Sequence, residues 1–168
     1  LILYKAGLIR KAEILKKVPP IKNKGIANNG NFRDTFELLG FDEPEVENVE
    51  RGRNKMTLRF YWKALKEIKE DLLGVFVVFD EGLRRVDPQR TAWFFTLGGE
   101  RVTSKWKKGQ ILKDEIYYYL PSLPFGRYFL ALGLMKLNGE TIPYYPAGHK
   151  EKFDFVLLMP FAIGVPLQ

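Results

Sequence analysis

The sequence has no cysteine and only one histidine, His149, among its 168 residues. The missing cysteines exclude a disulfide framework, a thiolate nucleophile and a cysteine-ligated metal. One histidine cannot build a multi-histidine site, which argues against zinc and haem centres, and we interpret His149 as a solvated loop residue. No apolar run reaches the roughly 18 residues that a membrane-spanning helix needs. These gaps leave few routes to metal or redox chemistry.

Motifs that carry catalysis are missing as well. The sequence contains no glycine-rich phosphate loop, no serine nucleophile elbow, no histidine-glutamate zinc motif and no cofactor fingerprint. None of its 20 Asp and Glu residues stands out as a pair for glycoside hydrolysis. The acidic residues at 42–50 lack the spacing and central glycine of a calcium loop, so we interpret them as a solvated edge. We therefore expect a protein that is not an enzyme and that has no cofactor and no bound metal.

The net charge of +7 is concentrated at the start of the chain. Residues 1–24 hold one acidic and seven basic residues, whereas the remaining 144 residues are nearly neutral. A basic segment attached to a balanced domain indicates a tail that contacts an acidic protein or an anionic membrane surface, and it disfavours nucleic acid as a partner. The residues of this basic tail are Lys5, Arg10, Lys11, Lys16, Lys17, Lys22 and Lys24.

The first 31 residues are predicted to form a helix and a linker. Apolar residues recur at spacings of three and four over residues 1–17, which predicts a short amphipathic helix. The following "VPP" ends it, and "IKNKGIANNGN" has the composition of a linker. The compact domain is therefore expected to span residues 32–168.

From residue 32 onward the periodic stretches are short and typical of strands. Period-two alternation is clear in "KMTLRFYWK" at 55–63, in "QILKDEIYYYL" at 110–120 and in the strand that follows "LPSLPFG". Further strands are predicted at 35–41, within 42–52, and at 151–159 and 160–167, while residues 91–99 are either another strand or an aromatic-rich loop. The apolar run at 72–86 predicts a hairpin whose first strand is covered on both faces. Regular spacing without helical segments predicts an all-β, antiparallel, immunoglobulin-like β-sandwich preceded by the short N-terminal helix.

Several stretches taken in order carry a resemblance to a known family. They are "NNGNFRDTFELLGFD", "LRFYWKAL", "TSKWKKGQILKDEIYYYLPSLPFGRYFLALGL" and "NGETIPYYP", which together cover about residues 28–146. This order resembles the sandwich domain attached to many bacterial membrane glycosyltransferases of the dolichyl-phosphate-mannose mannosyltransferase type. The chain departs from that pattern at Arg33, Met135 and Lys136. A looser resemblance, on the glycine-x-tyrosine strand, is to the O-antigen-recognising sandwich domains of polysaccharide ABC transporters.

The first resemblance implies an extracytoplasmic location in the cell envelope and no catalytic residues in this domain. From the residues themselves we assign structural roles to Trp62, Trp106, Gly109, Asp114, Gly126 and Tyr128. Trp106 is expected to plug one end of the sandwich and Gly109 to make a turn. Asp114 is expected to accept hydrogen bonds from backbone donors, because a buried carboxylate needs such partners.

Alternate aromatic residues on one strand cannot all face the core, so some are expected at the surface. The candidates for ligand or partner contacts are Trp93, Phe95, Tyr117, Tyr119, Tyr144 and Tyr145. Exposed aromatics serve as protein-interface anchors or stack on sugar rings. Two functions stay open at this point: an accessory or assembly subunit that binds a protein partner or forms a homo-oligomer, and a carbohydrate-binding module for cell-surface glycan.

Overall fold

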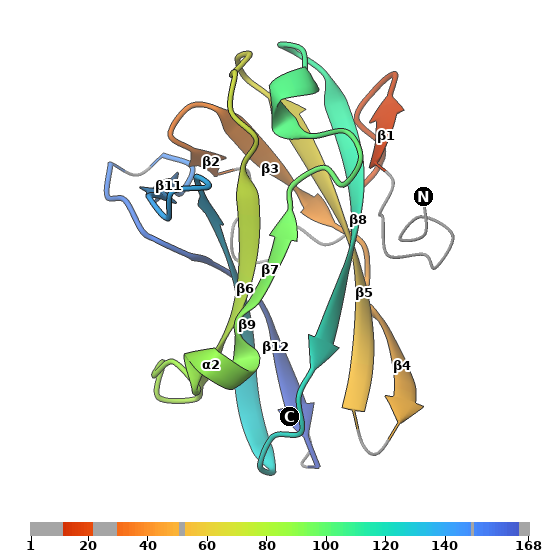
Figure 1. The fold of residues 1–168 in the computed structure, drawn as a ribbon, viewed down its shortest axis with the longest axis vertical. Coiled ribbons are helices and arrows are strands. Elements are labelled where there is room, and N and C mark those ends of the chain that lie inside the picture. The colour runs from red at the N-terminus through yellow and green to blue at the C-terminus, as the bar shows by residue number, and fades with distance from the viewer. Residues whose placement is uncertain (1–11, 22–29, 51–52, 149, 165–168) are drawn as a thin grey trace.

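A computed structural model describes residues 12–21, 30–50, 53–148 and 150–164 (Figure 1). Within these ranges about half of the residues lie in β-strands and almost none lie in helices. The elements in chain order are β1 (Ala12–Leu15), β2 (Asn31–Phe32), β3 (Phe36–Phe41), β4 (Glu45–Glu50), β5 (Arg53–Ala64), β6 (Leu73–Asp80), α2 (Pro88–Thr91), β7 (Trp93–Thr96), a 3-10 turn (Thr103–Lys105), β8 (Ile111–Leu120), β9 (Gly126–Met135), β10 (Thr141–Ile142), β11 (Tyr144–Tyr145) and β12 (Val156–Ile163).

The strands form two antiparallel sheets packed face to face. Sheet A has the order β1-β8-β5-β3-β2-β11, and β4 continues along the edge of β5 beyond β3. Sheet B has the order β10-β9-β6-β7, and β12 pairs with β9 on the side where β10 also pairs. The prediction of an all-β antiparallel sandwich is confirmed.

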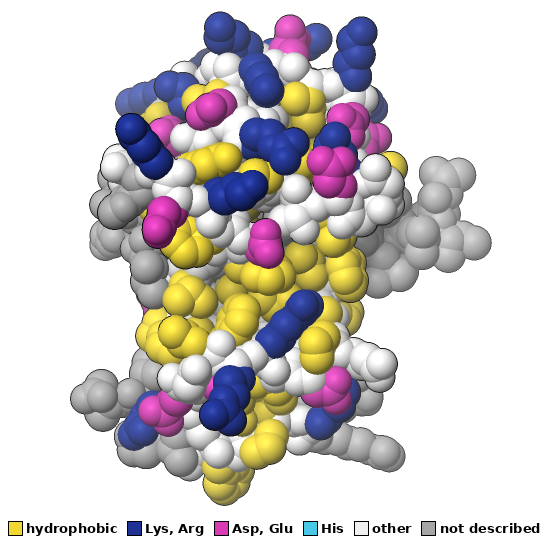
Figure 2. All heavy atoms as spheres, turned by 90° about the vertical axis from the view of Figure 1, so that its left-hand side faces the viewer, with side chains coloured by type: hydrophobic (Ala, Val, Ile, Leu, Met, Phe, Trp, Pro, Cys, Tyr) yellow, Lys and Arg dark blue, Asp and Glu magenta, His cyan; other side chains and the backbone are white. Residues whose placement is uncertain are grey.

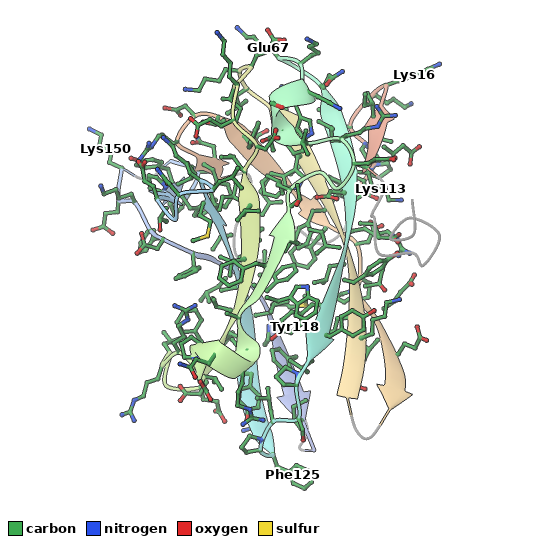
Figure 3. All side chains as sticks on the ribbon, in the orientation of Figure 1. Lys16, Glu67, Lys113, Tyr118, Phe125 and Lys150 are labelled. Carbon is green, nitrogen blue, oxygen red and sulfur yellow. The ribbon has the colours of Figure 1, made fainter. Side chains whose placement is uncertain are left out.

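The core lies between the sheets and is rich in aromatic rings. Phe76 of β6 contacts Phe60 of β5 with ring centroids 6.0 Å apart, and it contacts Tyr118 of β8 at 5.6 Å. Tyr118 points inward between the two sheets in Figure 3, and its hydroxyl donates a hydrogen bond to the backbone oxygen of Thr91. Burial raises the pKa of Tyr118 well above its ordinary value.

The strands predicted from alternation at 55–63, 110–120 and after "LPSLPFG" correspond to β5, β8 and β9. In β8 the inward and outward residues alternate strictly along the strand. The return arm of the hairpin predicted at 72–86 is not a strand, since only an isolated bridge joins Phe79 to Arg85. The two strands predicted at 151–159 and 160–167 are one strand, β12, with a register shift between Leu157 and Met159.

The predicted N-terminal helix is wrong where it can be compared with the structure. Residues 12–15 form β1, which pairs antiparallel with β8 at the edge of sheet A. The helical spacing does not produce a helix here because β8 provides backbone hydrogen-bond partners along its edge and because Ala12 becomes buried. These tertiary interactions outweigh the local helix propensity. Residues 1–11 lie outside the described residues. Within the described ranges, no helix is long and apolar enough to cross a membrane.

Candidate functional site

The outer faces of the two sheets differ in chemistry. We call the outer face of sheet B the apolar face. Its apolar residues include Val75, Val77, Phe79, Phe94, Phe129, Ala131, Gly133, Met135, Phe155 and Leu157. The polar residues Thr96, Arg127 and Thr141 lie at its margins. On the side of the molecule shown in Figure 2, apolar side chains form a band between two ends rich in charged residues. An apolar band of this kind on a protein surface marks an interaction site more often than chance.

The apolar face arises because β6 carries apolar residues at every position from Leu73 to Phe79, apart from Gly74. Phe76 and Val78 enter the core, so alternation turns Val75 and Val77 to the outside of the sheet. Val75 and Val77 are nevertheless buried, because neighbouring side chains on the same face close over them. The sequence predicts that this strand is covered on both faces. On the outer face of sheet B the cover consists only of the neighbouring side chains of that face.

A groove of about 260 Å³ is hollowed into the apolar face. Gly133 of β9 lines the groove, and its missing side chain leaves room for Phe155. A Cβ placed there would lie 2.8 Å from Cδ1 of Phe155, which folds over this part of the strand. Phe94, an exposed aromatic on the edge strand β7, also lines the groove. The groove therefore has an apolar floor and two aromatic walls.

Two opposite charges line the same groove. The guanidinium of Arg85 lies 5.5 Å from the ring centroid of Phe155, in a cation-π contact. Asp154, the neighbour of Phe155, also lines the groove. Both side chains are exposed, and neither forms an ion pair with another described residue. The groove thus offers an apolar surface with one cation and one anion.

We call the outer face of sheet A the charged face. Its residues on β5 and β8 include Lys55, Thr57, Arg59, Lys63, Lys113 and Glu115. Arg59 donates hydrogen bonds to Glu45 at 2.8 Å and to Glu115 at 3.0 Å. The hydrogen bond from Arg59, and then its charge, lower the pKa of Glu45, while Glu45 in turn raises the pKa of Arg59. At the centre of this face Arg59 and the two glutamates therefore satisfy one another.

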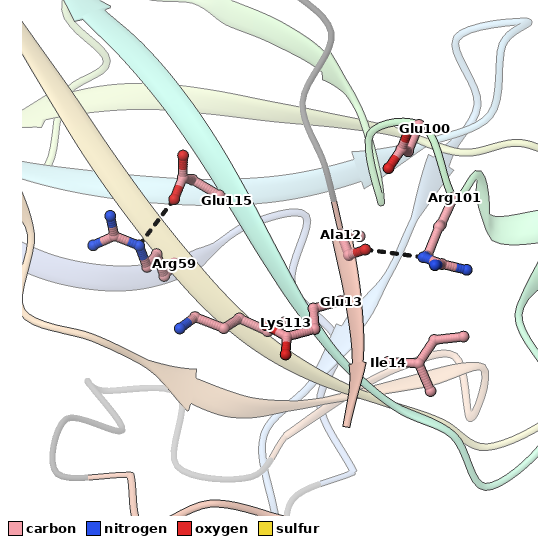
Figure 4. Close-up of a pocket in the computed structure, with 8 residues that line it drawn as sticks. All are labelled: Ala12, Glu13, Ile14, Arg59, Glu100, Arg101, Lys113 and Glu115. Carbon is pink, nitrogen blue, oxygen red and sulfur yellow. Dashed lines mark hydrogen bonds and ion pairs between the residues drawn. The ribbon is translucent and has the colours of Figure 1, made fainter. Parts of the chain in front are cut away.

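A second hollow, of about 510 Å³, lies at the junction of the charged face with β1 (Figure 4). Its lining residues are Ala12, Glu13, Ile14, Arg59, Glu100, Arg101, Lys113 and Glu115. The three cations and three carboxylates balance, and Arg101 already donates a hydrogen bond to the backbone oxygen of Ala12 at 2.9 Å. Among the described residues, no group of three or more His, Asp and Glu is arranged to hold a metal ion.

The predicted surface aromatics divide into two groups. Phe95 and Tyr144 are buried, with exposed fractions of 8% and 3%, so the expectation that they lie at the surface is wrong. Phe95 faces the core because it is paired with Gly74, whose missing side chain leaves room for its ring. Tyr144 packs on Phe32 with ring centroids 5.0 Å apart.

The other four predicted aromatics are partly exposed: Trp93, Tyr117, Tyr119 and Tyr145. Trp93 and Tyr119 contact each other with ring centroids 5.3 Å apart, where β7 approaches β8. Tyr117 donates a hydrogen bond to Glu115, and Lys55 lies over its ring. Tyr117 and Tyr119 lie on the charged face, whereas Trp93 belongs to β7 of sheet B and packs against the core. None of the four lines the groove of the apolar face.

The predicted structural residues have the expected surroundings. Trp106 is buried against Phe36, and its indole N–H donates to the backbone oxygen of Arg101. Asp114 is fully buried and accepts a hydrogen bond from the backbone N–H of Gly98 at 2.8 Å. Gly109 has a φ of 85° and turns the chain into β8. Trp62 is buried in the core, Gly126 begins β9, and the hydroxyl of Tyr128 donates to the backbone oxygen of Pro124.

The basic tail is only partly visible. Lys16 and Lys17 are exposed just after β1 (Lys16 is labelled in Figure 3), while Lys5, Arg10, Lys11, Lys22 and Lys24 lie outside the described residues. In the acidic stretch at 42–50, Asp42 accepts a hydrogen bond from Tyr61 and Glu45 pairs with Arg59. These two carboxylates act as partners for sheet A.

Sequence reasoning missed the groove. Its main residues, Phe94, Gly133, Phe155, Arg85 and Asp154, come from four separate segments. The one feature of the sequence that points to this region is the apolar run of β6, which indicates that both faces of the strand are covered. The run does not show which residues cover the outer face.

Comparisons with known proteins do not assign the chain to a family. No family model matches it, and no curated protein matches it. Among solved structures, a β-glucuronidase from glycoside hydrolase family 2 is 11% identical with a TM-score of 0.41, over 67% of this chain and 10% of that chain. The ApaA protein from Bordetella pertussis is 10% identical with a TM-score of 0.34, over 88% and 98%.

A β-glucuronidase from Parabacteroides merdae is 14% identical with a TM-score of 0.30, over 73% of this chain and 15% of that one. This chain thus spans about a tenth to a seventh of the two β-glucuronidases. With TM-scores below 0.5, these likenesses carry no argument about what this chain does.

Proposed function

We propose that this chain is a non-catalytic assembly module that works outside the cytoplasm and binds a protein partner through its apolar face. The observation that carries the proposal is the outer face of sheet B, whose central part on β6 and β9 is apolar although the described residues provide no third sheet over it. An antiparallel sheet that faces water alternates apolar inside with polar outside, as sheet A does. The departure in sheet B favours a face that a protein partner covers.

The exposed side chain of Phe94 makes binding of a partner to the apolar face energetically favourable. It is 56% exposed on an edge strand. Covering its ring removes on the order of 100 Å² of apolar surface from water, worth about 2–3 kcal/mol. Aromatic anchors surrounded by a polar rim are typical of the centres of protein interfaces. A protein partner therefore gains most from contacts at Phe94 and the groove beside it.

Site-specific photocrosslinking tests the proposal in cells. The photoreactive residue p-benzoylphenylalanine replaces Phe94 on the apolar face or, as a matched control, Tyr117 on the charged face. We expect a discrete protein adduct from position 94 that Leu157→Lys on the same face removes, and no adduct from position 117. Absence of an adduct at 94, or equal adducts at both positions, would contradict an assembly role for the apolar face.

The location outside the cytoplasm rests on the family resemblance and has its own test. Because the sequence has no cysteine, Ser122→Cys introduces a single thiol at an exposed position. We expect a membrane-impermeant maleimide to label this thiol in intact spheroplasts. Labelling only after lysis would contradict the proposed location.

Binding of a carbohydrate is the second candidate function, and the contact between Trp93 and Tyr119 favours it. Both rings are partly exposed where β7 of sheet B approaches β8 of sheet A, and a sugar ring could stack on them. This function predicts a change in tryptophan fluorescence on addition of cell-surface glycan, and loss of that change in Trp93→Ala. No change with glycan, together with an adduct at position 94, would favour the assembly module.

A further inference from the structure

One end of the sandwich carries a cluster of lysines that come from three separate segments. These segments are residues 16–17 after β1, residues 65–72 between β5 and β6, and residues 103–110 before β8. Their exposed lysines are Lys16, Lys17, Lys66, Lys69, Lys105, Lys107 and Lys108. We call this surface the lysine-rich end. Lys16 and Glu67 are labelled at this upper end of the molecule in Figure 3, and Phe125 is labelled at the lower end.

Hydrogen bonds hold the three segments together. The pairing of β1 with the first residues of β8 places residues 16–17 beside the segment that precedes β8. The backbone N–H of Gly109 donates to the backbone oxygen of Ala64, at the end of β5, at 2.7 Å. The hydroxyl of Thr103 donates to the backbone oxygen of Glu70 at 2.7 Å. The fold therefore gathers on one surface lysines that are far apart in the sequence.

The lysine-rich end has more cations than carboxylates. Glu67 pairs with Lys107 at 3.4 Å, and Glu70 pairs with Lys136 at 3.7 Å. Asp71, the third acidic residue of the three segments, accepts a backbone hydrogen bond at 3.3 Å. Apart from Lys107, the lysines of this end form no ion pair with a described residue. The bordering charges come as neighbours of opposite sign, namely Arg33 and Asp34, Glu37 and Lys63, Glu100 and Arg101, and Lys136 and Glu140.

The opposite end of the sandwich is balanced in charge. Residues 80–90 hold three acidic residues and three arginines. Asp80 accepts a hydrogen bond from the backbone N–H of Arg84, and Glu81 pairs with Arg127 at 3.6 Å. The excess of positive charge in the described part of the chain therefore lies toward one end of the long axis, which is vertical in Figure 1.

The chemistry of the lysine-rich end favours an extended anionic surface over a single bound group. All exposed cations of its three segments are lysines, which are hydrated point charges, whereas arginine supplies the planar fork that recognises one phosphate or one base. The only aromatic residue of the segments, Trp106, is buried, so they present no ring on which a base or a sugar could stack. Clusters of about four to eight basic residues are typical of proteins that bind anionic lipids.

We propose that the lysine-rich end docks on an anionic lipid membrane. The sequence predicts that the basic tail contacts an acidic protein or such a membrane, and here the folded domain itself supplies the contact. Docked by this end, the sandwich stands with its long axis pointing away from the membrane. The apolar face then lies to the side, where a protein partner can reach it. This inference concerns a different surface from the proposed function and does not depend on it.

Sedimentation of the full chain with lipid vesicles tests the docking. The vesicles contain phosphatidylglycerol and phosphatidylcholine in equal amounts, and vesicles of phosphatidylcholine alone are the control. We expect binding to the anionic vesicles only, and a steep fall in binding as the salt concentration rises, because salt screens the attraction. Equal binding to both kinds of vesicle, or no binding to the anionic vesicles at low salt, would overturn the inference.

Two double variants with the same net charge locate the contact. Lys66→Glu with Lys108→Glu reverses two charges of the lysine-rich end and is expected to weaken binding to the anionic vesicles by about thirtyfold or more. Arg84→Glu with Arg85→Glu makes the same change at the opposite end and is expected to alter binding by about threefold or less, because salt screens distant charges. All four side chains are exposed, so the fold should tolerate both variants, and circular dichroism checks this.

The two ways in which the variants can fail have different meanings. Equal losses in both double variants would show that net charge alone drives the binding. Unchanged binding in the lysine variant would assign the contact to the basic tail. Either result would overturn the lysine-rich end as the docking surface.

A fluorescent probe reports which end of the sandwich touches the lipid. Because the sequence has no cysteine, the dye NBD can be attached to one introduced thiol, in Glu67→Cys at the lysine-rich end or in Ser122→Cys toward the other end. We expect anionic vesicles to shift the emission of the dye to shorter wavelength at position 67 and not at position 122. A shift at position 122 instead, or tighter binding to a DNA duplex than to the anionic vesicles at the same salt concentration, would overturn the membrane as the occupant of this end.

Discussion

The two outer faces of this sandwich follow different rules, although both sheets are antiparallel and bury the same kind of inner face. On the charged face, polar residues alternate with core residues, and Arg59 is held between Glu45 and Glu115. On the apolar face, Val75 and Val77 are as buried as core residues, although they lie on the outside of the sheet.

This difference between the two outer faces indicates which of them would gain more free energy from binding a partner. Ion pairs on the charged face are internally satisfied, so a partner there would have to compete with contacts that already exist. The apolar face gains from any cover that removes its side chains from water. Under the proposed function, the charged face is therefore the solvent side of the molecule and the apolar face is its interaction side.

A lysine introduced on the outer face of each sheet tests this comparison, and it is expected to change the free energy of unfolding more than any other variant below. Val77→Lys puts an ammonium group at a site that is 0% exposed, and we expect a loss of about 3–5 kcal/mol in the free energy of unfolding, measured by urea titration. Thr57→Lys on the charged face is expected to change stability by about 0.5 kcal/mol or less, because Glu45 is its cross-strand neighbour. Similar losses at both positions would show that the outer faces are equally tolerant.

A methyl group at Gly133 tests whether Phe155 packs over the apolar face at this position. Gly133→Ala forces Phe155 away from the sheet, and we expect a cost of about 1–2 kcal/mol because the ring is only half-buried and can move. Gly126→Ala in the same strand is the control, since its nearest contact is an ordinary 3.6 Å to Tyr128. Its cost should be within a few tenths of a kcal/mol. Equal costs would mean that Phe155 does not close over Gly133.

The sequence predicted the inner faces better than the outer ones. Strict alternation located β5, β8 and β9, and the rule that a buried carboxylate needs donors anticipated the hydrogen bond from Gly98 to Asp114. Residues 12–15 were misassigned to a helix because their pairing with β8 is a contact across about a hundred residues. The groove could not be predicted for the same reason, because Arg85 and Asp154 come to line one groove only after β6, β9 and β12 are assembled.

The ion pairs of the charged face should respond to pH in a way that the apolar face does not. Pairing with Arg59 lowers the pKa of Glu45 in the folded protein. The stabilisation is therefore fully present above the ordinary pKa of a glutamate, near 4.3, and is lost as pH falls through the lowered folded value. We expect Arg59→Met to shift the urea midpoint at pH 7 by less than Gly133→Ala does, and this shift to vanish in acid.

Arg85→Met on the apolar face is the control for that titration, because Arg85 forms no ion pair with a described carboxylate. Its effect on the urea midpoint, measured at protein concentrations where the chain is monomeric, should not depend on pH between 3 and 7. A loss in acid that is the same for both arginine variants would show that general acid unfolding, and not the pair with Glu45, is being observed.

Tyr61 provides the smallest expected effect, confined to alkaline pH. Burial, followed by the hydrogen bond to Asp42, raises the pKa of Tyr61 to about 12. Its pKa in the unfolded chain is near 10, so the neutral tyrosine stabilises the fold fully below about pH 10 and loses that contribution as pH rises toward 12. The difference in urea midpoint between wild type and Tyr61→Phe should be constant from pH 7 to 9 and should then move against the wild type. Because Tyr61 lies on the charged face beneath Leu15 and Ile21, a flat difference up to pH 12 would mean that water reaches its hydroxyl, and that this corner of sheet A is as open as the rest of its outer face.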